Sequence, residues 1–189
     1  MKRILDQIDV RLQEQDYKTT LVPMDENETI FQLLIDLEET HALRMTVFFL
    51  GDLLKIASGQ EGIEEIAEHL DENKADFLQL FIRFPLEFHG ETAADLARLL
   101  LMINWSTPIG AFGVNESQKI IYYRHVFECM GEEPTIDLVM DAINGMEYYA
   151  TLRFDSVSMI AAGEKSIDDY IHELEMDNRK REEFPGYDL

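Results

Sequence analysis

The sequence predicts an α+β protein in which flanking helices cover an antiparallel sheet. Hydrophobic residues recur at helical spacing near the N-terminus and through much of the second half of the chain. Between these regions, three consecutive stretches rich in β-branched and apolar residues are separated by short turns. The composition, 46% hydrophobic and 10% aromatic, can supply a packed core although the formal net charge is -22. The expected order is a helix, three strands, an acidic insert with a strand, a helix, a hairpin and a long helix.

The first third of the chain predicts a helix followed by three strands. A helix over residues 2–15 is indicated by apolar residues on one face, namely Ile4, Leu5, Ile8 and Leu12. Strands are expected over residues 17–24, 29–37 and 45–50. Because a turn signal at residues 25–28 and a turn near residues 41–43 keep the connections short, we expect an antiparallel meander.

The middle of the chain combines an acidic segment with a strongly apolar one. Residues 58–73 place a narrow apolar face among many acidic side chains, which indicates a short helix or an ordered loop. Residues 77–84 predict a strand whose side chains are buried on both faces. Pro85 lacks a backbone donor and should limit how far this strand pairs.

The second half predicts a helix over residues 93–104, with Thr92 as its cap, and then a hairpin. The hairpin strands are expected over residues 109–114 and 119–128, and the small residues of the first strand indicate close backbone approach. A long helix should start with Pro134 in its first turn, kink at Gly145 and stop at Gly163. Residues 1–163 would then form one domain, followed by an acidic C-terminal helix and tail over residues 164–189.

The charge of -22 limits the partners that we expect. Nucleic acid and anionic membranes would be repelled, so a basic or extended protein segment is the more natural partner. The alternative that acidity only keeps the protein soluble stays open. One cysteine excludes an internal disulfide, and Asp6, Gln7 and Asp9 interrupt any signal-peptide core. No apolar run approaches the roughly 20 residues that span a bilayer, and we expect a cytoplasmic protein.

A search for chemistry gives few candidates. No two of the five histidines lie within four residues of each other, so no helix presents a paired-histidine metal site. We assign no catalytic, cofactor-binding or metal-binding residue and expect no cofactor. Cys129 and His125 share a strand face by their even spacing, so contact between them is conceivable. The alternative to protein binding is therefore a small-molecule-binding domain or enzyme with a pocket near Trp105, His125 and Cys129.

Three segments of the second half carry a resemblance to a known family. They are residues 99–104 (LLLMIN), 109–114 (IGAFGV) and 120–124 (IIYYR). Over residues 2–162 the order of elements resembles the YbjN-like family and the fold of type III secretion chaperones. The acidic insert and the tail depart from a standard chaperone.

The resemblance implies a small, acidic, often dimeric protein that binds other proteins and is not similar to an enzyme family. Secretion chaperones hold extended stretches of their clients, whereas YbjN-like proteins are described as proposed regulators of sensory or stress responses. We therefore expect a non-enzymatic, cytosolic, chaperone-like or regulatory protein that binds a protein partner, as a homodimer. The residues expected at its interface are Leu96, Leu99, Ile103, Trp105 and Tyr122.

Overall fold

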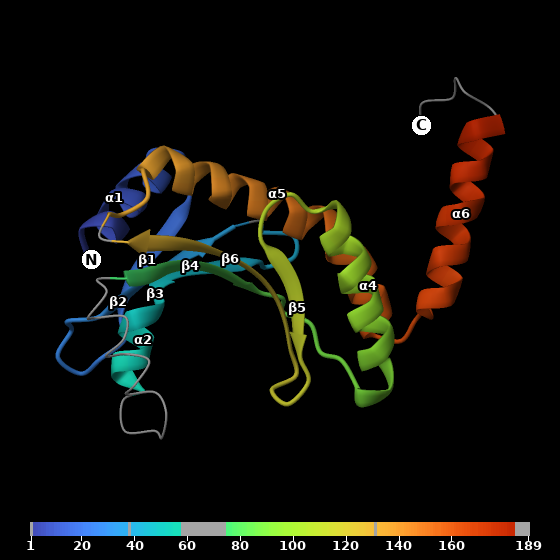
Figure 1. Cartoon of the computed structure of the whole chain (residues 1–189), viewed down its shortest axis with the longest axis horizontal. Helices are drawn as coiled ribbons and strands as arrows, with labels where there is room; N and C mark the ends of the chain where they lie inside the picture. Colours follow the sequence, from blue (N-terminus) through green and yellow to red (C-terminus); the bar gives the residue numbers. More distant parts are fainter. Residues whose placement is uncertain (1, 38, 58–74, 131, 184–189) are drawn as a thin grey trace.

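One six-stranded antiparallel sheet forms the centre of the molecule, with strand order β1-β2-β3-β4-β6-β5. The computed structural model describes residues 2–37, 39–57, 75–130 and 132–183. Helices α1 and α5 lie on one side of the sheet, α2 lies on the other side, and α4 stands beside the β5 edge (Figure 1). The predicted α+β class with an antiparallel sheet and flanking helices is confirmed.

The order of elements agrees with the sequence prediction except for one added short helix, α2. The elements are α1 (Lys2–Gln13), β1 (Lys18–Pro23), β2 (Phe31–Asp36), β3 (Arg44–Phe49), α2 (Leu50–Ile56), β4 (Ala75–Arg83), the 3-10 turn η1 (Gly90–Thr92), α4 (Ala93–Ser106), β5 (Ala111–Asn115), β6 (Ile120–Met130), α5 (Ile136–Ala161) and α6 (Ile167–Glu183). The acidic insert over residues 58–73 and the last residues of the tail, 184–189, lie outside the described residues.

The two faces of the sheet differ in burial. On the face toward α1 and α5, Met45, Leu80 and Tyr123 of neighbouring strands are completely buried. The opposite face is only partly covered, so Phe77 and Phe81 of β4 are half-buried. The expectation that residues 77–84 are buried on both faces is therefore wrong for this strand. It is central in the sheet, but only one of its faces lies against the helical layer.

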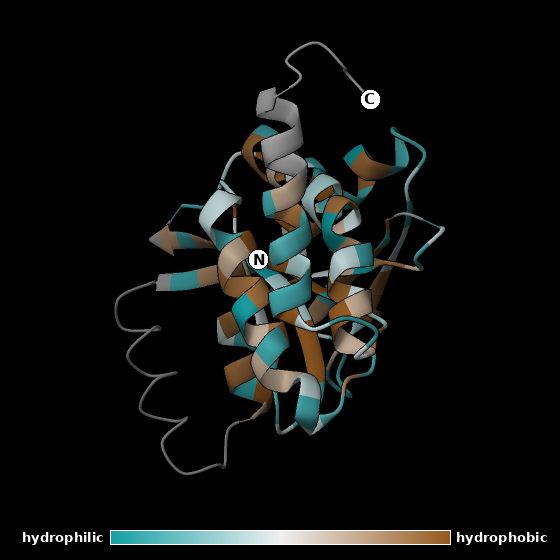
Figure 2. Cartoon of the chain, turned by 90° about the vertical axis from the view of Figure 1, so that its right-hand side faces the viewer, coloured by the Kyte–Doolittle hydropathy of each residue, from teal (hydrophilic) through white to brown (hydrophobic). Residues whose placement is uncertain are grey.

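The helices pack by their apolar stripes, as the periodicity indicated. Figure 2 shows hydrophobic residues along the strands and mixed polar and hydrophobic sides on the helices. In α1 the predicted stripe is buried, and its members are Ile4, Leu5, Ile8 and Leu12. The hydroxyl of Thr135 caps α5 by accepting a hydrogen bond from the Leu138 backbone N–H at 3.4 Å. Pro134 therefore precedes the cap instead of occupying the first turn.

The far end of α5 agrees better with the prediction. Gly163 follows the helix with a φ of +72°, a left-handed conformation that glycine adopts without strain, and so ends α5 as expected. Gly145 does not break the helix, which runs from Ile136 to Ala161. A Cβ at this position would lie 3.5 Å from the Ile109 side chain, which is an ordinary van der Waals contact.

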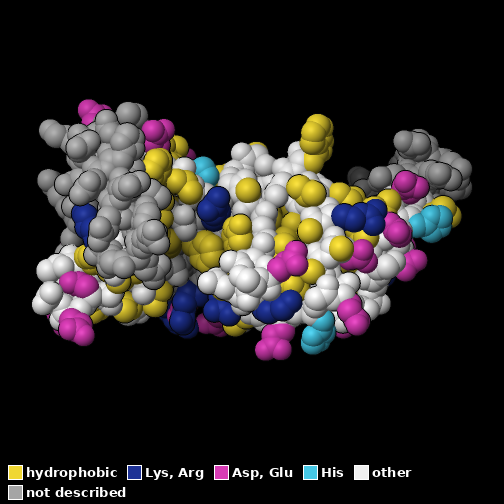
Figure 3. All heavy atoms as spheres, turned by 60° about the horizontal axis from the view of Figure 1, so that its bottom comes forward, with side chains coloured by type: hydrophobic (Ala, Val, Ile, Leu, Met, Phe, Trp, Pro, Cys, Tyr) yellow, Lys and Arg dark blue, Asp and Glu magenta, His cyan; other side chains and the backbone are white. Residues whose placement is uncertain are grey.

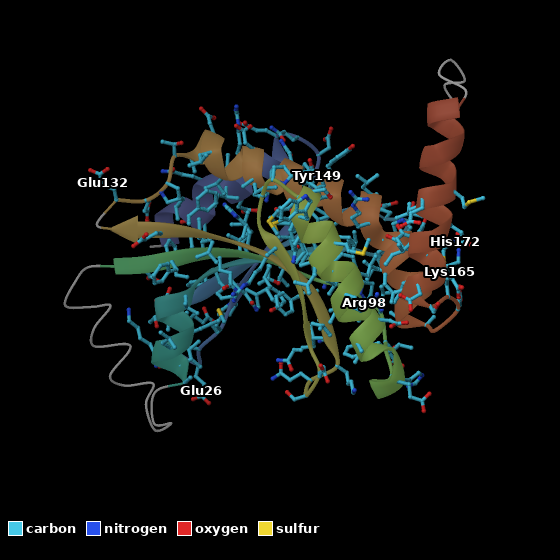
Figure 4. All side chains as sticks on the ribbon, turned by 45° about the vertical axis from the view of Figure 1, so that its right-hand side comes forward. Glu26, Arg98, Glu132, Tyr149, Lys165 and His172 are labelled. Atoms are coloured by element: carbon cyan, nitrogen blue, oxygen red, sulfur yellow. The ribbon has the colours of Figure 1, made fainter. Side chains whose placement is uncertain are left out.

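Helix α6 leaves the body of the molecule and touches it mainly at its first turn (Figure 1). The buried Ile167 anchors that turn, and its N–H donates to the Asp95 carboxylate of α4 at 3.1 Å. Arg98 of α4 pairs with Asp168 at 2.9 Å, and Figure 4 shows Arg98 on the helix next to α6. After Gly163, three non-helical residues lead into α6 at Ile167.

Candidate interaction surfaces

The five residues expected at an interface fall into two groups. Leu96, Leu99 and Ile103 lie on the inner side of α4 and are buried in the core. As core residues of the folded chain they cannot face a partner, and the expectation for them is corrected here. Their apolar spacing identified the inward side of a helix, which is the commoner reason for such a stripe.

Trp105, by contrast, lies almost entirely in solvent. Its side chain is 94% exposed near the end of α4, and Leu101, one turn earlier on the same side, is 70% exposed. Met102 adds a third exposed apolar side chain to this helix. The sequence signal that could have revealed this surface is the run of five apolar residues over positions 99–103, because a helix with one buried side cannot bury all of them.

A second exposed apolar pair lies on α5. Tyr148 and Leu152 are one turn apart, and both are exposed. A hydrogen bond joins the two helices next to these residues. The guanidinium of Arg153, which follows Leu152, donates to the hydroxyl of Ser106, which follows Trp105, at 3.4 Å. We call Leu101, Met102, Trp105, Tyr148 and Leu152 the α4–α5 apolar surface. These exposed apolar side chains on two adjoining helices are the candidates for an interaction site.

The end of α4 that carries Trp105 is fixed to the sheet. The Asn104 amide donates to the Phe112 carbonyl at 2.9 Å, and the Phe112 N–H donates back to the Asn104 side-chain oxygen at 2.7 Å. These two hydrogen bonds extend the hydrogen bonding of β5 beyond its outer edge. They hold the last turn of α4, and with it Trp105, in a defined position relative to the sheet.

Tyr122 belongs to a different surface, the exposed face of the sheet. Its ring stacks on that of Phe81 in the neighbouring strand, with centroids 5.4 Å apart. On the other side it lies over Gly113 of β5, where an added Cβ would meet the Tyr122 hydroxyl oxygen at 2.5 Å. The expectation that this glycine-containing strand needs close approach is therefore confirmed at Gly113. Its missing side chain leaves room for the tyrosine ring.

Three arginines accompany Tyr122 on the same face. The strand register places Arg44 of β3 opposite Arg83 of β4, Arg83 opposite Tyr122, and Phe81 opposite Arg124 of β6. We call this group the open sheet face, and its members are Leu34, Asp36, Arg44, Thr46, Phe81, Arg83, Tyr122, Arg124 and Val126. Figure 3, which views the side of the sheet away from α5, shows hydrophobic and basic side chains gathered there.

The suggested pocket near Trp105, His125 and Cys129 is not assembled by this geometry. His125 and Cys129 share the inner face of β6, but four residues of strand separate them by about 13 Å along the chain. His125 packs edge-on against Phe127, with ring centroids 4.6 Å apart. Trp105 points into solvent from a different element.

The titration of these two groups also reflects burial. Burial lowers the pKa of the His125 imidazole, because the charged form would lose its hydration. Burial, with smaller contributions from Asp76 and Glu133, raises the pKa of the Cys129 thiol. A raised thiol pKa reduces the fraction of thiolate, which is the reactive form. The arrangement therefore does not activate Cys129 as a nucleophile.

The described residues contain no group of three or more His, Cys, Asp or Glu side chains placed to hold a metal ion. Within the same residues, each helix is too short or too polar to cross a bilayer. The geometry thus defines an α+β domain with two exposed surfaces, one apolar and helical, the other aromatic and basic on the sheet. Comparison with protein-family models and with curated proteins finds no match to the chain.

Proposed function

We propose that this chain is a non-enzymatic, cytosolic protein-binding protein of the YbjN-like type, with a chaperone-like or regulatory role, that works as a homodimer. The observation that carries the proposal is the 94% exposure of Trp105 beside the equally apolar Leu101. Tryptophan and tyrosine are enriched at the centres of protein interfaces. A monomer gains nothing from holding them in water.

The α4–α5 apolar surface is the proposed dimer contact. A two-fold dimer needs one surface that is complementary to itself, and apolar side chains meet that condition because their contacts have no donor or acceptor polarity. Burial of a tryptophan removes about 150–250 Å² from water, which corresponds to about 4–6 kcal/mol before the entropic cost of association. The hydrogen bonds of Asn104 support this role, because a fixed helix end loses little freedom on binding.

The intrinsic fluorescence of the protein provides a direct test. Trp105 is the single tryptophan of the chain, so its emission reports this surface alone. We expect the emission maximum to move to shorter wavelength as the protein concentration rises, in parallel with a dimeric mass in size-exclusion chromatography with light scattering. Replacement of Leu101 by Glu keeps the reporter and should abolish both changes.

The matched control is Leu138→Glu, an equally apolar side chain that is 52% exposed in the first turn of α5 and lies outside the α4–α5 apolar surface. This variant should associate like the unaltered protein. A monomeric mass with an unshifted emission maximum at high micromolar concentration would refute the dimer. Loss of association in both variants would show that added charge, not this surface, is responsible.

A further inference from the structure

The open sheet face has a charge opposite to that of the molecule as a whole. The chain has 38 acidic residues and 16 lysines and arginines. Among the members of the open sheet face the balance is reversed, with the basic residues Arg44, Arg83 and Arg124 against the acidic residue Asp36. The outward strand positions around this group add one basic and one acidic residue, Lys18 and Glu128. Basic residues on this face are therefore concentrated well above their share of the sequence.

The placement of two arginines is unfavourable for the isolated chain. Arg44 and Arg83 are directly opposite each other on neighbouring strands, and like charges in that relation destabilise a sheet. Asp36 offsets the charge of Arg44 by an ion pair of 2.7 Å. For Arg83 and Arg124, both exposed, the described part of the chain provides no ion pair. With respect to the described residues these two guanidinium groups are unpaired, and each can bind a carboxylate in the bidentate geometry that arginine favours.

An apolar surface, which we call the floor, lies between these arginines and is formed by the rings of Phe81 and Tyr122. Phe81 is the direct neighbour of Arg124 across the strands and is two residues before Arg83 in β4. Its ring and that of Tyr122 form the stacked pair described above, and both are half-buried. A partner side chain on this floor could contact two aromatic rings while its neighbours reach the arginines.

We propose that the open sheet face binds an extended acidic segment of a partner protein. In this segment, acidic residues occupy alternate positions so that their side chains face the arginines. An aromatic or large apolar side chain of the segment lies on Phe81 and Tyr122. This proposal rests on the protein-binding function and specifies the class of partner. It keeps the expected extended segment but replaces a basic partner by an acidic one.

The spacing of the two arginines supports an extended partner. Arg83 is opposite Tyr122, and Arg124 is two residues farther along β6, so the two arginines are diagonal neighbours about 7–8 Å apart. In an extended chain, side chains two residues apart point the same way and are separated by about 7 Å. Two alternate carboxylates can therefore face the two arginines without bending the segment.

The test uses the full chain and a fluorescein-labelled peptide of about twelve residues, in which glutamate, glutamate and phenylalanine alternate with serine. Fluorescence anisotropy should show saturable binding that weakens as salt is raised. The Arg83→Gln and Arg124→Gln variants should each bind at least roughly tenfold more weakly, because a charged hydrogen-bond donor is lost. The control Arg11→Gln removes an equal charge from an exposed position on α1, across the sheet, and should change the affinity less than about threefold.

Two further probes decide between occupants. A peptide with lysine in place of glutamate should not bind, and equal binding would refute charge recognition. A single-stranded DNA oligonucleotide should bind more weakly than the acidic peptide, because the net charge of -22 repels a long polyanion. DNA binding as tight as that of the peptide, and equally sensitive to Arg83→Gln, would overturn the proposal of a protein segment.

The Leu101→Glu variant separates this inference from the proposed dimer. It should bind the acidic peptide as tightly as the unaltered protein, because Leu101 is on α4 and is not part of the open sheet face. Peptide binding without self-association would refute the dimer alone. Self-association without binding of the acidic peptide would refute the acidic partner alone.

Discussion

The pair of hydrogen bonds between Asn104 and Phe112 can be measured through the stability of the protein. Replacement of Asn104 by Ala removes both bonds, at 2.9 and 2.7 Å, and each contributes about 1 kcal/mol to the free energy of unfolding. Alanine favours the helix by about 0.6 kcal/mol more than asparagine does, which offsets part of the loss. The net expectation is a destabilisation of about 1.4 kcal/mol. For a chain of this size, that lowers the Tm by about 3–6 °C.

Urea denaturation followed by circular dichroism measures this difference, and Asn144→Ala is the matched control. Asn144 is exposed in the middle of α5, and the described residues give its side chain no hydrogen-bond partner. The control should be neutral or slightly stabilising, since it gains helix propensity and loses no bond. The two alanine variants should therefore differ by about 2 kcal/mol. If Asn104→Ala is as stable as Asn144→Ala, the pair of hydrogen bonds does not hold α4 to β5.

Three further predictions follow from buried or strained groups. The buried Cys129 thiol should react with a disulfide reagent at pH 8 at least roughly tenfold more slowly in the native protein than in urea. Burial and the Glu147 carboxylate raise the pKa of Tyr17 from 10.0 to about 12. The contribution of Tyr17 to the free energy of unfolding is therefore complete below pH 10 and is lost as the pH rises toward 12. Tyr17→Phe should flatten that part of the pH–stability profile. Gly110→Ala should destabilise by about 1–3 kcal/mol, because φ is +66° and the new Cβ would meet the Arg124 carbonyl oxygen at 2.6 Å.

A matched variant controls the glycine measurement. Gly90→Ala places a Cβ with no atom within 4 Å and should have a small effect on the urea midpoint. Native labelling of Cys129 as fast as in urea would contradict its burial, and equal alkaline profiles for Tyr17→Phe and the unaltered chain would contradict the contact with Glu147.

Local patterns in the sequence predicted most of the elements correctly. The stripe of α1, the three-stranded meander and the stop of α5 at Gly163 depend on periodicity and on backbone preference, which are properties of neighbouring residues. Helix α2 was missed because its stabilisation is not local. The N–H of Gly51 in its first turn donates to the Asp76 carboxylate at 2.9 Å, and Asp76 lies 25 residues later, in β4.

The candidate surfaces were less predictable than the elements. Periodicity separates an apolar from a polar side of α4, but the prediction did not use the continuous apolar run of this helix, which is longer than its inner side can bury. Leu96 therefore proved to be a core residue, while Trp105 is exposed. The basic group on the sheet could not be recognised from the sequence for a different reason. Its members Arg44, Arg83 and Arg124 belong to three strands whose register depends on tertiary pairing.

The sequence by itself determined the α+β class, the order of the helices and strands, and an acidic chain with a substantial core. These follow from composition and from side-chain periodicity, which act over a few residues. Only the tertiary structure decided that Arg83 and Arg124 stand as diagonal neighbours beside the stacked Phe81 and Tyr122, and that Trp105 remains in solvent. The reason is that a shift of one residue in strand pairing moves every side chain to the opposite face, so the folded sheet decides which groups meet.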